Sequence, residues 1–94
     1  MAVMTITGGT AGVGKATAVR FARAGYDVGI IARDRQSLEA TQQALRQFGV
    51  RVHVVQADVA DADAINTAAC EIEKQLGAIE VWVNNAMCAV LAPF

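Results

Sequence analysis

The chain has 94 residues, of which 54% are hydrophobic and 18% charged, and its formal net charge is -1. This composition is typical of one globular domain and excludes an intrinsically disordered chain. We expect no nucleic-acid partner because there is no basic excess, and no membrane partner because no apolar run approaches the ~20 residues of a span. The N-terminus lacks the features of a signal peptide, so we expect a cytoplasmic protein in which Cys70 and Cys88 stay free thiols.

Strand and helix patterns alternate along the chain. Apolar, β-branched runs predict strands at residues 2–6, 28–32, 52–55 and 79–83. Helical periodicity predicts helices from about Val13 to Ala24, from an Asp34 cap toward Gly49, and from an Asp61 cap toward Gly77. This alternation predicts one α/β domain over residues 1–94, with a parallel sheet and right-handed crossovers.

A glycine-rich turn follows the first strand. Residues 7–14 read TGGTAGVG, which places Gly8, Gly12 and Gly14 between the strand and a helix. Glycines let a ligand come close to the backbone, and the free N–H groups at a helix start attract phosphate. Such a turn after the first strand is typical of the first half of a Rossmann-type doubly wound sheet, so the expected strand order is 3-2-1-4. The ligand is expected across the carboxyl ends of the strands.

The same segment allows a second interpretation. Residues 9–15 also satisfy GxxxxGK, the start of a P-loop for nucleoside triphosphates. A P-loop then needs a hydroxyl group for Mg²⁺, but Ala16 stands at that position and Thr17 comes one residue too late. The sequence therefore favours a dinucleotide, and a degenerate P-loop stays the weaker alternative.

Distinctive short segments also follow the other three strands. They are Ala32-Arg33, Asp58-Val59 and Asn84-Asn85-Ala86. Together with TGGTAGVG, in this order and at these intervals, they make the whole chain resemble the short-chain dehydrogenase/reductase family. The resemblance implies an NAD(P)-dependent oxidoreductase that transfers hydride between its cofactor and a carbonyl or secondary alcohol.

The resemblance also implies a role for each residue of the glycine turn. Gly8 would permit the turn, while Gly12 and Gly14 would let the pyrophosphate and the helix approach the strand closely. Val13 stands where the family has an apolar residue near the pyrophosphate and the nicotinamide.

For the later segments, the resemblance implies contacts with the adenosine half of the cofactor. Asp58 would accept a hydrogen bond from the adenine amino group, with the Val59 backbone beside it. Asn84 would tie neighbouring strands together. Asn85 and Ala86 complete the cofactor-binding set, and Ala86 would line the adenosine ribose.

The end of the second strand bears on the choice between NAD and NADP. An acidic residue there would bind the ribose 2′-hydroxyl and repel a 2′-phosphate, but Ala32 stands at that position. Arg33 follows and can pair with a phosphate in a bidentate fork, with Arg35 nearby and a Thr10 hydroxyl in the glycine turn. The family's other NADP marker, a basic residue before the second motif glycine, is replaced by Ala11. The sequence therefore favours NADP over NAD.

Two departures from the family pattern bear on function. Met87 stands where the fourth-strand motif has Gly, which leaves the geometry beside the nicotinamide ribose open. The family's chemistry uses a Ser and a Tyr-x-x-x-Lys pair, but the only Tyr is Tyr26, without a Lys at that spacing, and the only Ser is Ser37. We therefore expect no catalytic residue here and interpret the chain as the cofactor-binding part of a longer reductase, with a non-catalytic NAD(P)-binding module as the alternative.

The shortness of the chain predicts exposed apolar surface. The family has a fifth strand beside the fourth, so here we expect the fourth strand at an unpaired edge. By the crossover rule, two helices cover one sheet face and one covers the other, which leaves part of that second face open. We expect the chain alone to be poorly soluble or oligomeric, and homo-oligomers for its full-length relatives.

Overall fold

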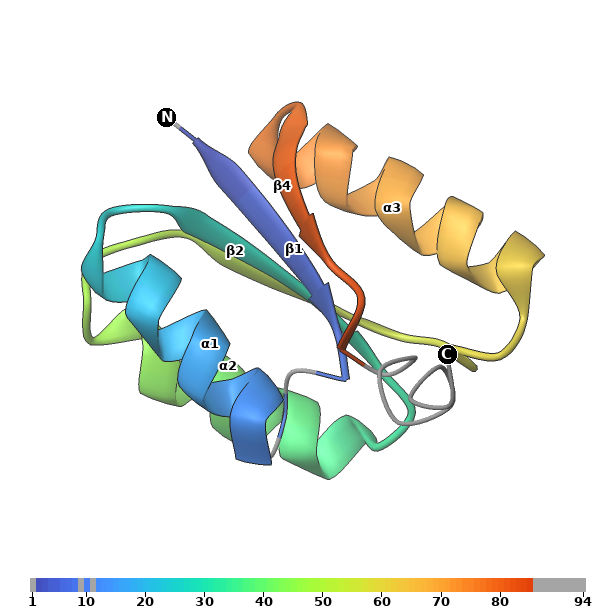
Figure 1. The fold of residues 1–94 in the computed structure, drawn as a ribbon, viewed down its shortest axis with the longest axis horizontal. Helices are drawn as coiled ribbons and strands as arrows, with labels where there is room; N and C mark the ends of the chain where they lie inside the picture. Colours follow the sequence, from blue (N-terminus) through green and yellow to red (C-terminus); the bar gives the residue numbers. More distant parts are fainter. Residues whose placement is uncertain (1, 9, 11, 86–94) are drawn as a thin grey trace, which may run out of the picture.

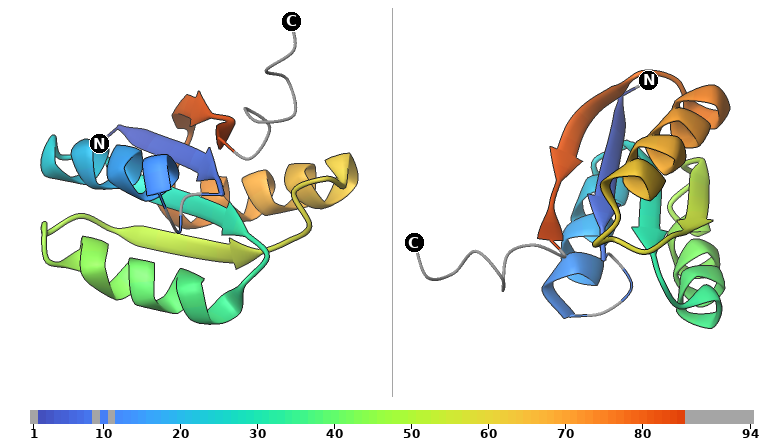
Figure 2. Two further views of the ribbon diagram at one scale, coloured as in Figure 1. Left: turned by 60° about the horizontal axis from the view of Figure 1, so that its bottom comes forward. Right: turned by 90° about the vertical axis from the view of Figure 1, so that its right-hand side faces the viewer.

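The computed structural model describes residues 2–8, 10 and 12–85, and strands and helices alternate through them. Their bounds are β1 (Val3–Thr7), α1 (Gly12–Arg23), β2 (Asp27–Ala32), α2 (Arg35–Arg46), β3 (Val52–Gln56), α3 (Ala62–Leu76) and β4 (Ile79–Val83). The strands pair in parallel in the order β3-β2-β1-β4 (Figures 1 and 2). The expected Rossmann-type α/β fold and the strand order 3-2-1-4 are confirmed.

Two apolar layers hold the helices on the sheet. Helices α1 and α2 lie on one face and α3 lies on the other (Figure 1). Successive residues of a strand point to opposite faces, so Met4 belongs to the cluster under α1 and α2, whereas Val3 belongs to the cluster under α3. Every residue of β1 and β2 is buried because helices cover both faces of these central strands. Each fully buried Ile or Leu side chain contributes about 1.5–3 kcal/mol to this packing.

Helix starts follow the caps that the sequence predicts. The Asp34 side chain accepts from the Gln36 backbone N–H at the start of α2. The Asp61 side chain accepts from the N–H groups of Asp63 and Ala64 at the start of α3. These contacts satisfy backbone donors that have no partner within a helix. The predicted bounds need small corrections. Helix α2 ends at Arg46, before Gly49. Strand β3 ends one residue later than predicted, at Gln56, because a polar residue does not continue the apolar pattern on which the prediction depends.

Strand β4 lies at one edge of the sheet. Among the described strands it pairs only with β1, at the end of the strand order. Val81 and Val83 pack against the α1–α2 cluster, but Trp82 is 40% exposed. Trp82 lines a cleft of about 470 Å³ together with Val59 on the α3 side. The second face of the sheet is therefore only partly covered at β4.

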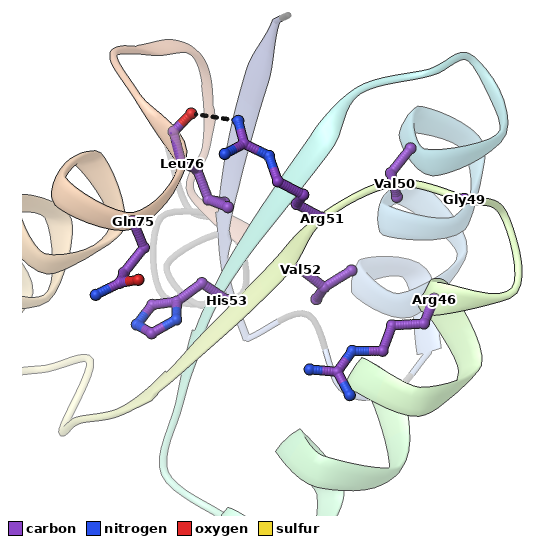
Figure 3. A pocket seen from close by; sticks show the side chains of 8 residues that line it. All are labelled: Arg46, Gly49, Val50, Arg51, Val52, His53, Gln75 and Leu76. Atoms are coloured by element: carbon purple, nitrogen blue, oxygen red, sulfur yellow. Dashed lines mark hydrogen bonds between the residues drawn. The ribbon is translucent and has the colours of Figure 1, made fainter.

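The amino ends of the strands are held by a buried carboxylate. Asp27 is 1% exposed and accepts from the Arg51 backbone N–H and from its Nη2, each at 2.9 Å. Arg51 Nη2 also donates to the Leu76 carbonyl at 2.9 Å (Figure 3). A charge is tolerated at this depth because it is paired and hydrogen-bonded. The pair joins the starts of β2 and β3 to the end of α3.

Two further expectations concern membranes and thiols. None of the described helices is both long enough and apolar enough to cross a bilayer. Cys70 is an exposed free thiol on α3, and Cys88 lies outside the described residues.

Candidate nucleotide-binding site

The turn between β1 and α1 depends on glycine at two places. Gly8 has φ 74° and Gly12 has φ 58°, a left-handed conformation that L side chains rarely adopt. The Gly8 N–H donates to the Ile31 carbonyl at 2.8 Å, which holds the start of the turn against the end of β2. Thr10 is half-buried within the turn. The backbone therefore bends here where a residue with a side chain would be strained.

Gly14 is buried at the closest approach of α1 to the strand ends. A Cβ atom at this position would lie 2.5 Å from the Gly8 carbonyl oxygen and 2.7 Å from Asn85 Nδ2. Asn85 Nδ2 in turn donates to the Gly8 carbonyl at 3.1 Å. Three residues that the sequence assigns to the cofactor, Gly8, Gly14 and Asn85, are thus in contact. The missing side chain lets the helix start sit directly over the end of β1.

The first turn of α1 is free of competing negative charge. It carries no acidic residue, so its N–H groups and partial positive charge are available to an anion. Val13 lies in this first turn and is 75% exposed. The Thr17 hydroxyl donates to the Val13 carbonyl at 2.8 Å, a bond within the helix. The hydroxyl nearest to the P-loop position is thus already bonded to the backbone.

At the ends of β2 and β3, an arginine is presented on a fixed backbone. The Ala57 N–H donates to the Ala32 carbonyl at 2.9 Å, and Gln56 Nε2 donates to the Arg33 carbonyl at 2.9 Å. The Arg33 side chain is exposed and makes no hydrogen bond or ion pair with the described residues. Arg35 differs, because its Nη1 lies 3.5 Å from Glu39 Oε2. Of the two arginines, Arg33 is therefore the one that is free to bind a ligand.

The residue after Arg33 is a helix cap whose charge is stabilised. The Asp34 carboxylate accepts from the Ser37 hydroxyl and from the Gln36 N–H. The hydrogen bond from the Ser37 hydroxyl is the main cause that holds the pKa of Asp34 below its ordinary value. Desolvation opposes it, and the backbone N–H groups of Gln36 and Ser37 lower the pKa by smaller amounts. The lowered pKa favours the charged form of this carboxylate, which lies next to Arg33 in the chain.

The loop after β3 carries the residues predicted for adenine. Asp58 is exposed, and its Oδ1 accepts from the Ala60 N–H at 2.9 Å. This contact shapes the turn and uses one of the two carboxylate oxygens. Val59 is half-buried and packs against the cluster under α3. Both residues lie at the carboxyl edge of the sheet, where the sequence places them.

After β4, one predicted strand contact is confirmed. Asn84 Oδ1 accepts from the Thr7 hydroxyl at 3.0 Å, which ties the end of β4 to the end of β1. Ala86, expected at the adenosine ribose, and Met87 lie outside the described residues. The hydrogen bonds of the Thr7 and Gln56 side chains are not predicted from the sequence. The only signal for either is a polar residue at the last position of a strand.

A second cleft, of about 520 Å³, lies at the amino ends of the strands (Figure 3). Arg46, Arg51 and His53 line it, but Arg51 is bonded to Asp27 and His53 Nε2 lies 2.7 Å from Glu71 Oε2. Two of its four polar side chains are thus engaged in the fold. Within the described residues, no group of three or more His, Cys, Asp or Glu side chains is arranged to hold a metal. The carboxyl edge is therefore the candidate site.

Comparison with known proteins agrees with this geometry. The family model described as short chain dehydrogenase matches residues 2–94. The chain belongs to this family. General stress protein 39 of Bacillus subtilis is 35% identical over 85 residues, which cover 89% of this chain and 30% of the relative. The chain therefore spans about a third of the length of the short-chain dehydrogenases that it matches.

Solved structures of the family give the same fold with bound cofactors. Actinorhodin polyketide ketoreductase with NADPH superposes with a TM-score of 0.84 and 31% identity, over 89% of this chain and 32% of the ketoreductase. NAD⁺-bound xylitol dehydrogenase superposes with a TM-score of 0.82 and 26% identity, over 86% of this chain and 31% of the dehydrogenase. Short-chain dehydrogenases of this fold thus bind either form of the nicotinamide dinucleotide.

Proposed function

We propose that this chain binds NADP(H) at the carboxyl edge of its sheet, as the cofactor-binding part of a short-chain dehydrogenase. The observation that carries the proposal is Arg33, an exposed and unpaired guanidinium directly after β2. Ala32 precedes it where an acidic residue would repel a 2′-phosphate. The segment thus combines an attractive group for the phosphate with the absence of a repulsive one.

The remaining site residues divide the dinucleotide between them. The pyrophosphate lies at the start of α1, where Gly12 and Gly14 admit it and the N–H groups of the first turn receive its charge. Val13, which is exposed, lies along the path toward the nicotinamide. Thr10 offers a hydroxyl within the same turn. This arrangement places the charge of the pyrophosphate on the backbone N–H groups of the helix start.

The adenosine lies toward β3 and β4. The free carboxylate oxygen of Asp58 accepts from the adenine amino group, beside the backbone of Val59. Asn85 supports the site through its bond to the Gly8 carbonyl, which fixes the turn that the cofactor crosses. Ala86 completes the set at the ribose. Each of these roles rests on the family resemblance, and those of Asp58, Val59 and Asn85 rest also on the position of the residue at the carboxyl edge.

The reaction of the whole protein is hydride transfer to a carbonyl or from a secondary alcohol. When bound, the nicotinamide ring supplies or accepts the hydride. The residues of this chain bind the cofactor and orient it, and we propose that they do so without catalysing the reaction by themselves. The Ser and Tyr-x-x-x-Lys groups of the family have no counterpart in residues 1–94.

The test compares NADPH and NADH binding by the parent and by Arg33→Ala, measured by calorimetry. A charged hydrogen bond contributes about 1.5–3 kcal/mol, so we expect NADPH affinity to fall about 10- to 100-fold while NADH affinity changes little. Arg46→Ala is the matched control, because it removes an exposed arginine from the opposite edge of the sheet. Equal affinities of the parent for the two cofactors would refute the proposal.

A further inference from the structure

The side-chain amide of Gln56 is hydrogen-bonded to the backbone of Arg33. Gln56 is the last residue of β3 and stands opposite Ala32 in the parallel register. The ladder continues for one more bond, from the Ala57 N–H to the Ala32 carbonyl. The carbonyl of Arg33, the first residue after β2, accepts a hydrogen bond from Gln56 Nε2 at 2.9 Å. A side chain thus extends the strand pairing by one residue beyond the last ladder bond.

On its other side, Arg33 is followed at once by a helix start. The Asp34 carbonyl accepts from the Leu38 N–H at 3.0 Å, and its side chain caps α2. Arg33 is therefore the single residue between a strand ladder and a capped helix. Without Gln56 the Arg33 carbonyl would have no hydrogen bond within the described residues, because no other described residue donates to it.

We propose that Gln56 is a positioning residue for recognition of the 2′-phosphate of NADP(H). This inference rests on the proposed function, since it concerns how Arg33 meets that phosphate. The hydrogen bond to the Arg33 carbonyl fixes the backbone from which the long side chain extends. On binding, only the side-chain torsions of Arg33 then have to be ordered. A bidentate contact between a planar guanidinium and a phosphate gains affinity from such pre-organisation, because both hydrogen bonds form only when the guanidinium has one orientation.

The chemistry of glutamine suits this task. Its amide donates to a carbonyl and brings no charge to the edge where the phosphate lies. A glutamate of the same shape could not donate and would repel the phosphate. Methionine has a stem of similar length and no charge, and it lacks the amide that donates to the Arg33 carbonyl. That substitution therefore isolates the contact.

The experiment measures NADPH and NADH dissociation constants of the parent chain, Gln56→Met and Gln42→Met by calorimetry. Gln42→Met is the matched control, because Gln42 Nε2 donates to the Val52 carbonyl at 3.0 Å, the same kind of contact away from the carboxyl edge. We expect Gln56→Met to weaken NADPH about three- to tenfold and to leave NADH within about twofold, with both constants unchanged in the control. Gln56→Ala is a second variant and should give the same change in the NADPH/NADH ratio.

Two results would overturn the inference while the proposed function stands. One is a parent that prefers NADPH and a Gln56→Met variant with the same preference. The other is an equal loss of both cofactors, which a merely structural role would produce. A parent that binds both cofactors equally, or neither, would instead refute the proposed function, and the positioning role of Gln56 would fall with it.

Discussion

Replacing Gly14 by alanine tests how closely the helix must approach the strand ends. The added Cβ would lie 2.5 Å from the Gly8 carbonyl oxygen and 2.7 Å from Asn85 Nδ2, closer than real Cβ contacts come. Gly8 has little room to move, because its N–H is bonded to the Ile31 carbonyl at 2.8 Å. To relieve both contacts, α1 must shift away from the Gly8 carbonyl, and Asn85 must turn aside and lose its bond to Gly8. The methyl group therefore disturbs the fold and the cofactor site together.

The size of the effect follows from opposing contributions. Overpacking a tight contact costs about 1–3 kcal/mol. Loss of the Asn85–Gly8 hydrogen bond adds about 0.5–1.5 kcal/mol. Alanine at a helical position recovers up to about 1 kcal/mol relative to glycine. We expect Gly14→Ala to lower the free energy of unfolding by about 0.5–3.5 kcal/mol, with weaker binding of NADPH and NADH alike because the pyrophosphate is common to both.

The assay is urea unfolding followed by fluorescence of Trp82, the only tryptophan of the chain. The control is a double-mutant cycle with Asn85→Ala, which removes one of the two obstructing groups. We expect the double variant to lose less stability than the sum of the single variants. Additive losses, or a Gly14→Ala variant within about 0.5 kcal/mol of the parent, would refute the reasoning.

Two further predictions concern stability. In Gly29→Ala, the new Cβ would lie 2.7 Å from Ile72 Cγ2 and 2.9 Å from its Cδ1. We expect urea unfolding to show a loss of about 1–3 kcal/mol, partly recovered by Ile72→Val, and no recovery would count against this contact. The pKa of Asp34 is lower in the folded state than its ordinary value of 3.8. Asp34 therefore stabilises α2 fully at a pH above 3.8, and this stabilisation is lost as the pH falls through the folded-state pKa. The difference in urea midpoint between the parent and Asp34→Ala should therefore be present at neutral pH and close well below pH 3.8, and a difference independent of pH would contradict the assignment.

Local patterns predicted most of the fold because they act over a few residues. The caps at Asp34 and Asp61 need only a carboxylate before a periodic helix, and both are present. The strand order follows from alternation and the crossover rule, which allow few other arrangements. The end of β3 was placed one residue early because Gln56 does not continue the apolar run. Periodicity marks the apolar part of a strand and misses a polar last residue.

Contacts between distant residues were harder to foresee. Asn85 bonds to Gly8 across 77 positions, and Gln56 bonds to Arg33 across 23. Both depend on the register of neighbouring strands, and continuous apolar runs that are buried on both faces carry no alternation from which to predict it. The resemblance to the family predicts Arg33 directly after the second strand, and in the structure it follows the carboxyl end of β2. The resemblance carried no information on which neighbour would hold the Arg33 backbone.

The most direct test of this account is the location of the bound cofactor on the ¹⁵N-labelled chain. We predict that NADPH shifts the amide resonances at the carboxyl edge, including those of Gly14, Arg33 and Asp58, and leaves those of Arg46 and Arg51 at the opposite edge in place. The difference between the NADPH and NADH spectra should centre on Arg33, because the 2′-phosphate is the only group that distinguishes the two ligands. Shifts confined to the amino edge, or NADPH and NADH spectra that coincide at Arg33, would contradict the account.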